Sequence, residues 1–154
     1  MAFSARSLDA ETMEVNFKID LTPVASFINS ETLRQVITVI AVMLTLDVLW
    51  LTANAAYHRQ VFAELQSKPL QVRWIPAVFV YLLMIVAVWF FAVAPSTSWA
   101  EAAGRGALIG LVMYGLYDLT NYATLAAYPL HYTLRDMAWG TVLCAAAAAA
   151  AKAF

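Results

Sequence analysis

Four long apolar stretches, separated by short polar segments, follow one another along the chain. They cover about residues 36–57, 74–94, 107–128 and 137–153. Each approaches the roughly 20 residues with which an α-helix crosses a hydrocarbon core about 30 Å thick. The pattern predicts an all-α integral membrane bundle of four transmembrane helices, with both chain termini on one side of the membrane. We expect this transmembrane domain over 31–154.

The segment before the first stretch has a different character. Residues 1–30 are polar and carry charges of both signs, with only scattered apolar positions. No apolar core follows a basic start, so the segment does not have the pattern of a cleavable signal peptide. We interpret residues 1–30 as an N-terminal extramembrane arm.

Local signals predict where the helices begin. Asn29 or Ser30 is placed to cap the first helix. Ser98 and Glu101 form a capping box, which predicts that the third helix begins near Trp99, outside the lipid. Pro129 interrupts the third apolar stretch. Thr133 and Asp136 then form a second, weaker capping box, which predicts that the fourth helix begins only after Pro129.

Composition supports the membrane class and excludes others. Hydrophobic residues make up 63% of the 154, and charged residues make up 12%, about half of what soluble domains carry. The net charge of -1 provides no basic surface for nucleic acid. Basic residues are only slightly more frequent in the loops that join the first helix to the second and the third to the fourth than on the opposite face. The side of the membrane on which these loops lie therefore stays open. The membrane itself, a bacterial inner membrane or an organelle membrane, also stays open.

Two carboxylates, Asp47 and Asp118, interrupt the first and third apolar stretches near their middle. A carboxylate at such a depth costs about 2.5–3.5 kcal/mol on insertion scales. Helical spacing gives each carboxylate polar neighbours, so we expect two polar stripes that face each other inside the bundle. The predicted intramembrane polar cluster contains Asp47, Asn54, Tyr114, Asp118, Asn121 and Tyr122.

This cluster has two interpretations. A functional one makes it a proton relay, a substrate site or a ligand pocket, in which two neighbouring carboxylates share a proton. A structural one makes it a set of hydrogen bonds that hold the helices together, each contributing about 0.6–2 kcal/mol in a membrane. The residues alone do not separate the two, and we assign no catalytic residue.

Small residues mark the expected helix contacts. Gly106 and Gly110 form a GxxxG pattern, followed by Gly115, and the fourth stretch contains seven consecutive alanines over 145–151. Small side chains let membrane helices approach closely. We interpret both features as packing surfaces.

Two histidines, His58 and His131, fall on the loop side of the first and fourth stretches. They are candidates for an interfacial site that holds a lipid headgroup, a pigment or a metal. Two histidines without a neighbouring cysteine or glutamate make a poor metal site. We therefore predict no metal and favour histidines that lie in solvent at the interface.

Several strings resemble a known family. They are Tyr-Asp-Leu-Thr-Asn at 117–121, Leu-Asp-Val-Leu-Trp-Leu at 46–51, and an Asp-x-x-Trp-Gly string that begins at 136. Over about residues 35–152 the chain resembles a bacterial family of predicted four-helix membrane proteins, a domain of unknown function with the family number 2177. The resemblance implies the fold and no activity. It singles out four pattern residues without giving them a role: Trp50, Asp136, Trp139 and Gly140.

Three functional hypotheses follow. The first is a non-catalytic accessory subunit of a larger membrane complex, which docks through the arm and its helix faces onto other membrane-protein subunits. The second is a small membrane enzyme or carrier that acts on a lipid-like molecule with Asp47 and Asp118 as its acid–base pair. The third is a subunit that holds a pigment or quinone at His58 or His131. We expect membrane lipids as partners and bound lipid in place of a firmly implied cofactor, and no nucleic acid.

Overall fold

The computed structural model describes residues 29–153, and nearly all of the predicted arm over 1–30 lies outside them. The described residues form helices and no strand, so the predicted all-α class is confirmed. The helices are α2 (Ser30–Ala53), α3 (Ala55–Gln66), α4 (Trp74–Ala87) with its π-helical continuation η1 (Val88–Val93), α5 (Trp99–Thr124) and α6 (Leu130–Ala153).

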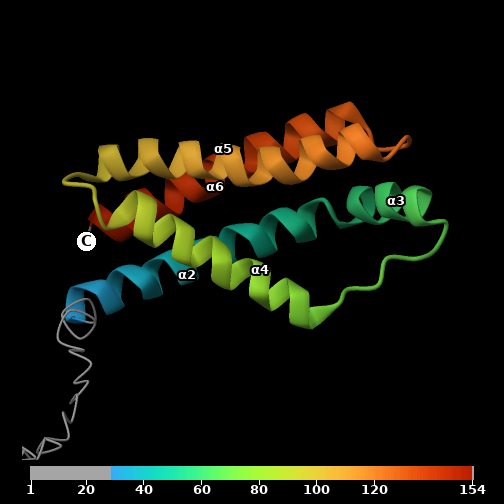
Figure 1. Ribbon diagram of the computed structural model, residues 1–154. Helices are drawn as coiled ribbons and strands as arrows, with labels where there is room; N and C mark the ends of the chain where they lie inside the picture. The colour runs from blue at the N-terminus through green and yellow to red at the C-terminus, as the bar shows by residue number, and fades with distance from the viewer. Residues whose placement is uncertain (1–28, 154) are drawn as a thin grey trace, which may run out of the picture.

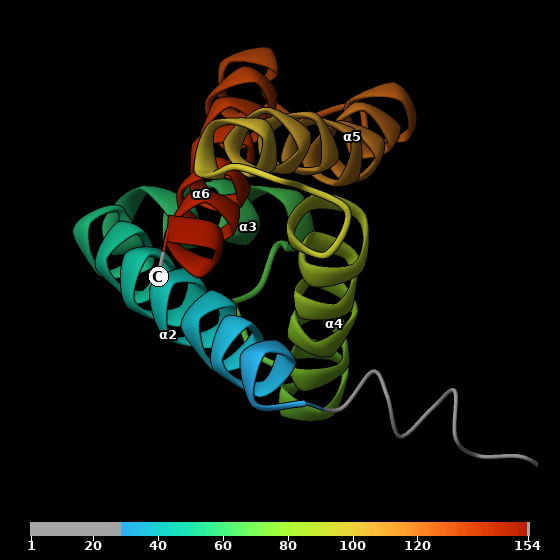
Figure 2. The same ribbon diagram turned by 90° about the vertical axis from the view of Figure 1, so that its left-hand side faces the viewer.

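The long helices are packed around α6. Helices α5 and α6 form an antiparallel hairpin along their whole length (Figure 1), and α6 also packs against α2. Seen from the end, α6 lies between α5 and α2, with α4 to one side (Figure 2). The continuation η1 contacts α5 and α6, whereas α4 contacts α2 and its first part diverges from the hairpin (Figure 1). The first part of α4 therefore lies apart from α5 and α6 (Figure 1).

Two helical segments are long and apolar enough to cross a membrane. They are Ser30–Ala53 and Trp74–Val93. Helices α5 and α6 have the required length, with 26 and 24 residues. Their lower hydropathy has a simple source, since charged residues such as Asp118, Arg135 and Asp136 lie within them.

The predicted first span needs a correction at its end. We predicted a continuous segment to residue 57, but α2 ends at Ala53 and α3 starts at Ala55. The break falls at Asn54, whose side-chain amide donates to the backbone oxygen of Trp50 at 2.8 Å. A side chain that bonds the backbone in this way competes with regular helix geometry.

The turn between α5 and α6 is also placed differently. The third helix ends at Thr124, four residues before the predicted end at 128, and the fourth begins at Leu130. Pro129 starts that helix, because its carbonyl accepts the backbone N–H of Thr133 at 3.1 Å. Thr133 thus lies inside the helix, and the predicted capping box of Thr133 and Asp136 is wrong.

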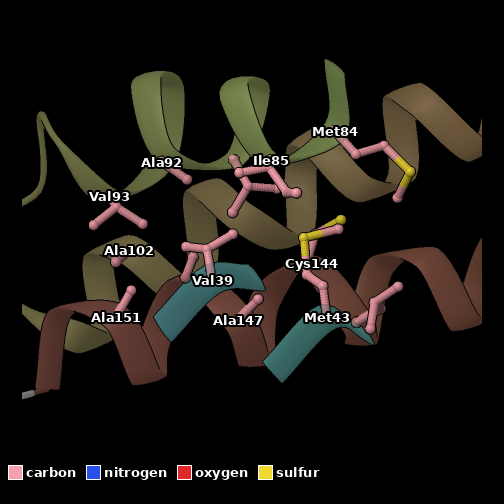
Figure 3. Packing of buried hydrophobic residues seen from close by; sticks show 13 residues of the cluster. Val39, Met43, Met84, Ile85, Ala92, Val93, Ala102, Cys144, Ala147 and Ala151 are labelled. Carbon is pink, nitrogen blue, oxygen red and sulfur yellow. The ribbon is translucent and has the colours of Figure 1, made fainter. Parts of the chain in front are cut away.

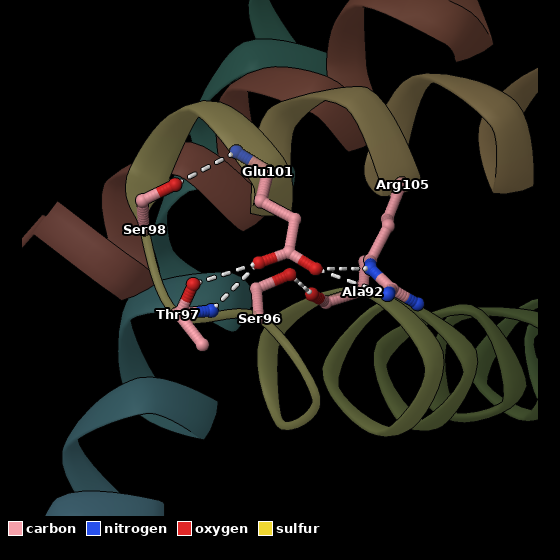
Figure 4. Close-up of polar contacts among 6 residues, drawn as sticks. All are labelled: Ala92, Ser96, Thr97, Ser98, Glu101 and Arg105. Atoms are coloured by element: carbon pink, nitrogen blue, oxygen red, sulfur yellow. Dashed lines mark hydrogen bonds and ion pairs between the residues drawn. The ribbon is translucent and has the colours of Figure 1, made fainter.

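Two helix N-caps form at the residues that the local sequence predicts. The side chain of Asn29 accepts the backbone N–H of Thr32 at 2.7 Å. The Ser98 hydroxyl accepts the backbone N–H of Glu101 at 3.2 Å, and the helix begins at Trp99 as predicted (Figure 4). The Glu101 carboxylate accepts from the Thr97 backbone at 2.9 Å. Together with the Thr97 hydroxyl and Arg105, this hydrogen bond holds the pKa of Glu101 below its usual value.

Small side chains form the contact between α5 and α6. A Cβ atom at Gly106 would lie 2.5 Å from the carbonyl oxygen of Cys144, and one at Gly110 would overlap the carbonyl oxygen of Gly140. Gly115 is less constrained, with Met137 as its nearest neighbour at 3.3 Å. Residues from all four long helices complete the buried core, including those labelled in Figure 3: Val39, Met43, Met84, Ile85, Ala92, Val93, Ala102, Cys144, Ala147 and Ala151.

Candidate functional site

Asp47 connects three helices. It lies near the end of α2 and is buried. Its Oδ2 accepts the hydroxyl of Tyr81 from α4, and its Oδ1 accepts the indole N–H of Trp139 from α6 at 3.0 Å. Each carboxylate oxygen therefore has one donor and keeps a free lone pair.

Asp118 on α5 is fully buried. Its Oδ1 accepts the hydroxyl of Tyr128 at 2.8 Å. Its Oδ2 has no hydrogen-bond partner among the described residues, and the carboxyl group of Asp136 on α6 lies nearby. Two neighbouring carboxyl groups disfavour the ionisation of both, because their negative charges repel each other.

The carboxyl pair differs from the predicted one. We predicted that Asp47 and Asp118 face each other, but Asp118 pairs with Asp136, and Asp47 is held by Tyr81 and Trp139. The spacing of the two aspartates from the turn between α5 and α6 could have identified Asp136 as the partner of Asp118. Asp118 lies six residues before the end of α5 and Asp136 six residues after the start of α6, so an antiparallel pair of helices brings them level.

The depth of the site also changes. Asp47 lies six residues before Ala53, the last residue of α2. At 1.5 Å per residue, all three carboxyl groups lie about 9 Å from the same end of their helices. The sequence placed Asp47 and Asp118 near mid-span. The shorter α2 and α5 move the cluster toward the end of the molecule that carries α3.

An open-sided groove lies beside this cluster, where α4 diverges from α5. It has a volume of about 500 Å³. Its polar lining consists of two carboxyl groups and three phenols; the remaining residues are apolar. The lining residues are Asp47, Ala77, Val80, Tyr81, Leu83, Met84, Met113, Tyr114, Tyr117 and Asp136.

The other members of the predicted polar cluster are dispersed. Tyr114 lines the groove and its ring fills the space left by Gly140. Asn54 lies at the α2–α3 break and accepts a hydrogen bond from Arg135. Asn121 lies beside Tyr117, and Tyr122 is exposed. Neither of these two residues lines the groove.

The family-pattern tryptophans form a stack next to the carboxyl groups. The rings of Trp50 and Trp139 are parallel within 4°, with centroids 4.5 Å apart. The stack holds the indole N–H of Trp139 toward Asp47. Position 140 requires a glycine, because any side chain there would clash with the Tyr114 ring. These residues therefore position the site.

The two histidines have different environments. His131 is exposed and faces the Tyr57 ring at 5.9 Å between centroids. His58, on α3 beyond the end of α2, is buried, with Nδ1 2.8 Å from the Tyr132 hydroxyl. The prediction of a solvated histidine is wrong for His58, because the start of α6 covers it. Burial, with a smaller effect of the Arg135 charge, lowers its pKa. Residues 29–153 contain no group of three His, Cys, Asp or Glu side chains able to hold a metal ion.

These features define a helical protein with two membrane-length apolar helices and a buried carboxyl cluster beside a groove. The model of the predicted membrane protein family DUF2177 matches residues 32–153. The chain belongs to this family, and the resemblance found in its sequence is confirmed. No curated protein and no solved structure matches the chain.

Proposed function

We propose that this chain is a four-spanning membrane protein that binds a lipid-like molecule in the groove and exchanges a proton with its polar group, as a small carrier or enzyme. One observation carries the proposal. The groove of about 500 Å³ is mostly apolar, opens to the side, and has Asp47 and Asp136 in its lining.

The lengths of α5 and α6 support four spans. At 1.5 Å per residue their 26 and 24 residues extend about 39 and 36 Å, which exceeds a hydrocarbon core of about 30 Å. The two carboxyl groups well inside these helices, those of Asp118 and Asp136, are turned toward neighbouring helices or the groove, as expected for carboxyl groups within a membrane. In a four-helix bundle of this kind, the opening beside α4 faces the lipid.

The shape and lining of the groove favour an amphipathic ligand. Apolar side chains such as Val80, Leu83 and Met113 suit an acyl or isoprenoid chain. Asp47 offers free lone pairs to a donor on the polar end of the same molecule. A few placed polar groups within an apolar wall are typical of small-molecule sites.

The carboxyl pair supplies the proton chemistry. Asp136 lines the groove and contacts Asp118, which lies fully buried behind it. A proton held by this pair can pass from Asp136 to an acceptor on the bound molecule and return. Tyr128 donates to Asp118 and stabilises the negative charge left on the pair.

The test compares two tryptophan substitutions on α4. Ala77→Trp fills the groove, whereas Val78→Trp lies on the outward face, where Val78 is 55% exposed and does not line the groove. Native mass spectrometry of protein released from detergent should show one retained lipid-like molecule on the wild type and on Val78→Trp, and none on Ala77→Trp. Equal retention by all three proteins contradicts the proposal.

The accessory-subunit hypothesis depends on the arm over 1–30, which lies outside the described residues except for its last two positions. Docking through that arm stays a prediction. A pigment or quinone also stays a prediction, and the mass of the retained molecule distinguishes a quinone from other lipid-like ligands.

A further inference from the structure

Three buried polar atoms that have no hydrogen-bond partner among residues 29–153 lie around one small pocket at the end of the molecule that carries α3. They are Nε1 of Trp50, the hydroxyl of Tyr57 and Nε2 of His58. His58 is only 9% exposed. A buried donor or acceptor that nothing pairs with destabilises the folded protein. Three of them at one pocket point to a ligand that pairs with them together.

A guanidinium group closes the same pocket. Arg135 lies over the Trp50 ring at 5.0 Å and over the Tyr57 ring at 5.4 Å, and it donates to Asn54. It forms no ion pair with any carboxylate among residues 29–153. Most of its five N–H donors are thus available, and its side chain is exposed.

The hydrogen-bonding character of the pocket is that of a donor set. The indole N–H of Trp50 and the guanidinium of Arg135 can only donate. In the tautomer whose Nδ1 accepts from the Tyr132 hydroxyl, the Nε2 atom of His58 carries the proton and is a further donor beside the pocket. Such a set matches an acceptor with several oxygens and a negative charge.

One acidic group lines the pocket and must be accounted for. Asp136 is shared by the pocket and the groove. Its carboxyl group lies near that of Asp118, and two neighbouring carboxyl groups disfavour the ionisation of both. A neutral Asp136 would not repel an anion at Arg135.

We propose that Trp50, Tyr57, His58 and Arg135 form a binding site for a phosphate group at the membrane surface. The pocket lies at the end of α2, between Trp50 in its last turn and Tyr57 on α3, at the level where aromatic and basic side chains meet lipid headgroups. With the guanidinium over the two rings the pocket has no room for a water molecule. The exposed Arg135 side chain is its outer wall, so the phosphate enters as that side chain swings outward. The chemistry suits both a lipid phosphate and free phosphate.

The experiment measures thermal unfolding of the full-length protein in detergent micelles with three probes. They are dioleoylphosphatidic acid, dioleoylglycerol with the same acyl chains and no phosphate, and inorganic phosphate. Arg135→Gln is compared with Arg59→Gln; Arg59 lies on α3, bonds the backbone oxygen of Ala55 and does not line the pocket. Phosphatidic acid should raise the melting temperature of the wild type and of Arg59→Gln. Its affinity for Arg135→Gln should fall at least about tenfold, the loss expected for a hydrogen bond to a charged group.

A second variant keeps the test valid if Arg135→Gln folds poorly. Tyr57→Phe removes an unpartnered hydroxyl, so without ligand its melting temperature should stay equal or rise. Its affinity for phosphatidic acid should nevertheless fall, by about tenfold. A purely structural role for Tyr57 does not produce these opposite effects.

The outcomes separate the sources of the phosphate. An Arg135-dependent shift with inorganic phosphate alone assigns the site to free phosphate, and a shift with phosphatidic acid only assigns it to a lipid. Equal shifts in wild type and Arg135→Gln, equal shifts with dioleoylglycerol, or no shift with either phosphate probe overturn the proposal. Neither Arg135 nor Tyr57 lines the groove, so failure here leaves the proposed function intact.

Discussion

Substitution of Gly110 by alanine tests the close contact between α5 and α6. The new Cβ would overlap the carbonyl oxygen of Gly140 and lie 3.0 Å from the Cβ of Cys144. A backbone carbonyl cannot move aside as the end of a flexible side chain can. The two helices must therefore separate, and the hairpin that holds Asp118 beside Asp136 must shift with them.

The magnitude follows from two opposing effects. Alanine in place of glycine stabilises a helix by about 0.5–1 kcal/mol. Overpacking of a close contact costs about 1–3 kcal/mol, and a clash with backbone belongs to the upper part of that range. We expect Gly110→Ala to lower the free energy of unfolding by about 1–2 kcal/mol.

Gly104→Ala is the matched control, because nothing lies within 4 Å of a Cβ at that position on the same helix. It should raise the free energy of unfolding by about 0.5–1 kcal/mol. Unfolding by sodium dodecyl sulfate in mixed micelles, followed by helical circular dichroism, measures both. If the two substitutions change stability in the same direction, the close contact at Gly110 is wrong.

Two further predictions concern His58 and the topology. Since burial lowers the pKa of folded His58 below 6.5, the unfolded chain binds the proton more readily, and stability should fall as the pH drops below about 6.5. His58→Gln should lose this dependence, and an unchanged pH profile in the same unfolding assay would count against the buried histidine. Four spans place the end of α6 opposite the loop after α3, so in a Cys144→Ala background a cysteine at Ala153 and one at Ser67 should react with impermeant reagents from opposite sides. Reaction from the same side would exclude four spans.

The sequence predicts best what depends on neighbours along the chain. The start of α5 at Trp99 follows from Ser98 and Glu101, whose hydrogen bonds form within one helical turn. The close approach at Gly106 and Gly110 follows from side-chain size alone. The cost of inserting a carboxylate into a membrane predicts that Asp47 and Asp118 are shielded from lipid, and both are buried.

The remaining features depend on how the helices are placed in space. Apolar residues continue across Asn54, so hydropathy does not show the break between α2 and α3. Asp136 was assigned to a cap because its pairing with Asp118 depends on where the turn at Pro129 lies. The groove arises because α4 diverges from α5, and an apolar sequence has the same composition whether its helix packs closely or splays away.

The most direct test of a specific lipid-like ligand in the groove uses a photoreactive residue on α4. Benzoylphenylalanine in place of Leu83 lies in the groove, and in place of Leu82, which is also exposed but does not line the groove, it faces bulk lipid. After illumination in native membranes, mass spectrometry identifies the attached molecules. Position 83 should be enriched in one molecular species far beyond its share of the membrane, and position 82 should reflect bulk lipid composition. The same distribution of lipids at both positions would contradict a binding site in the groove.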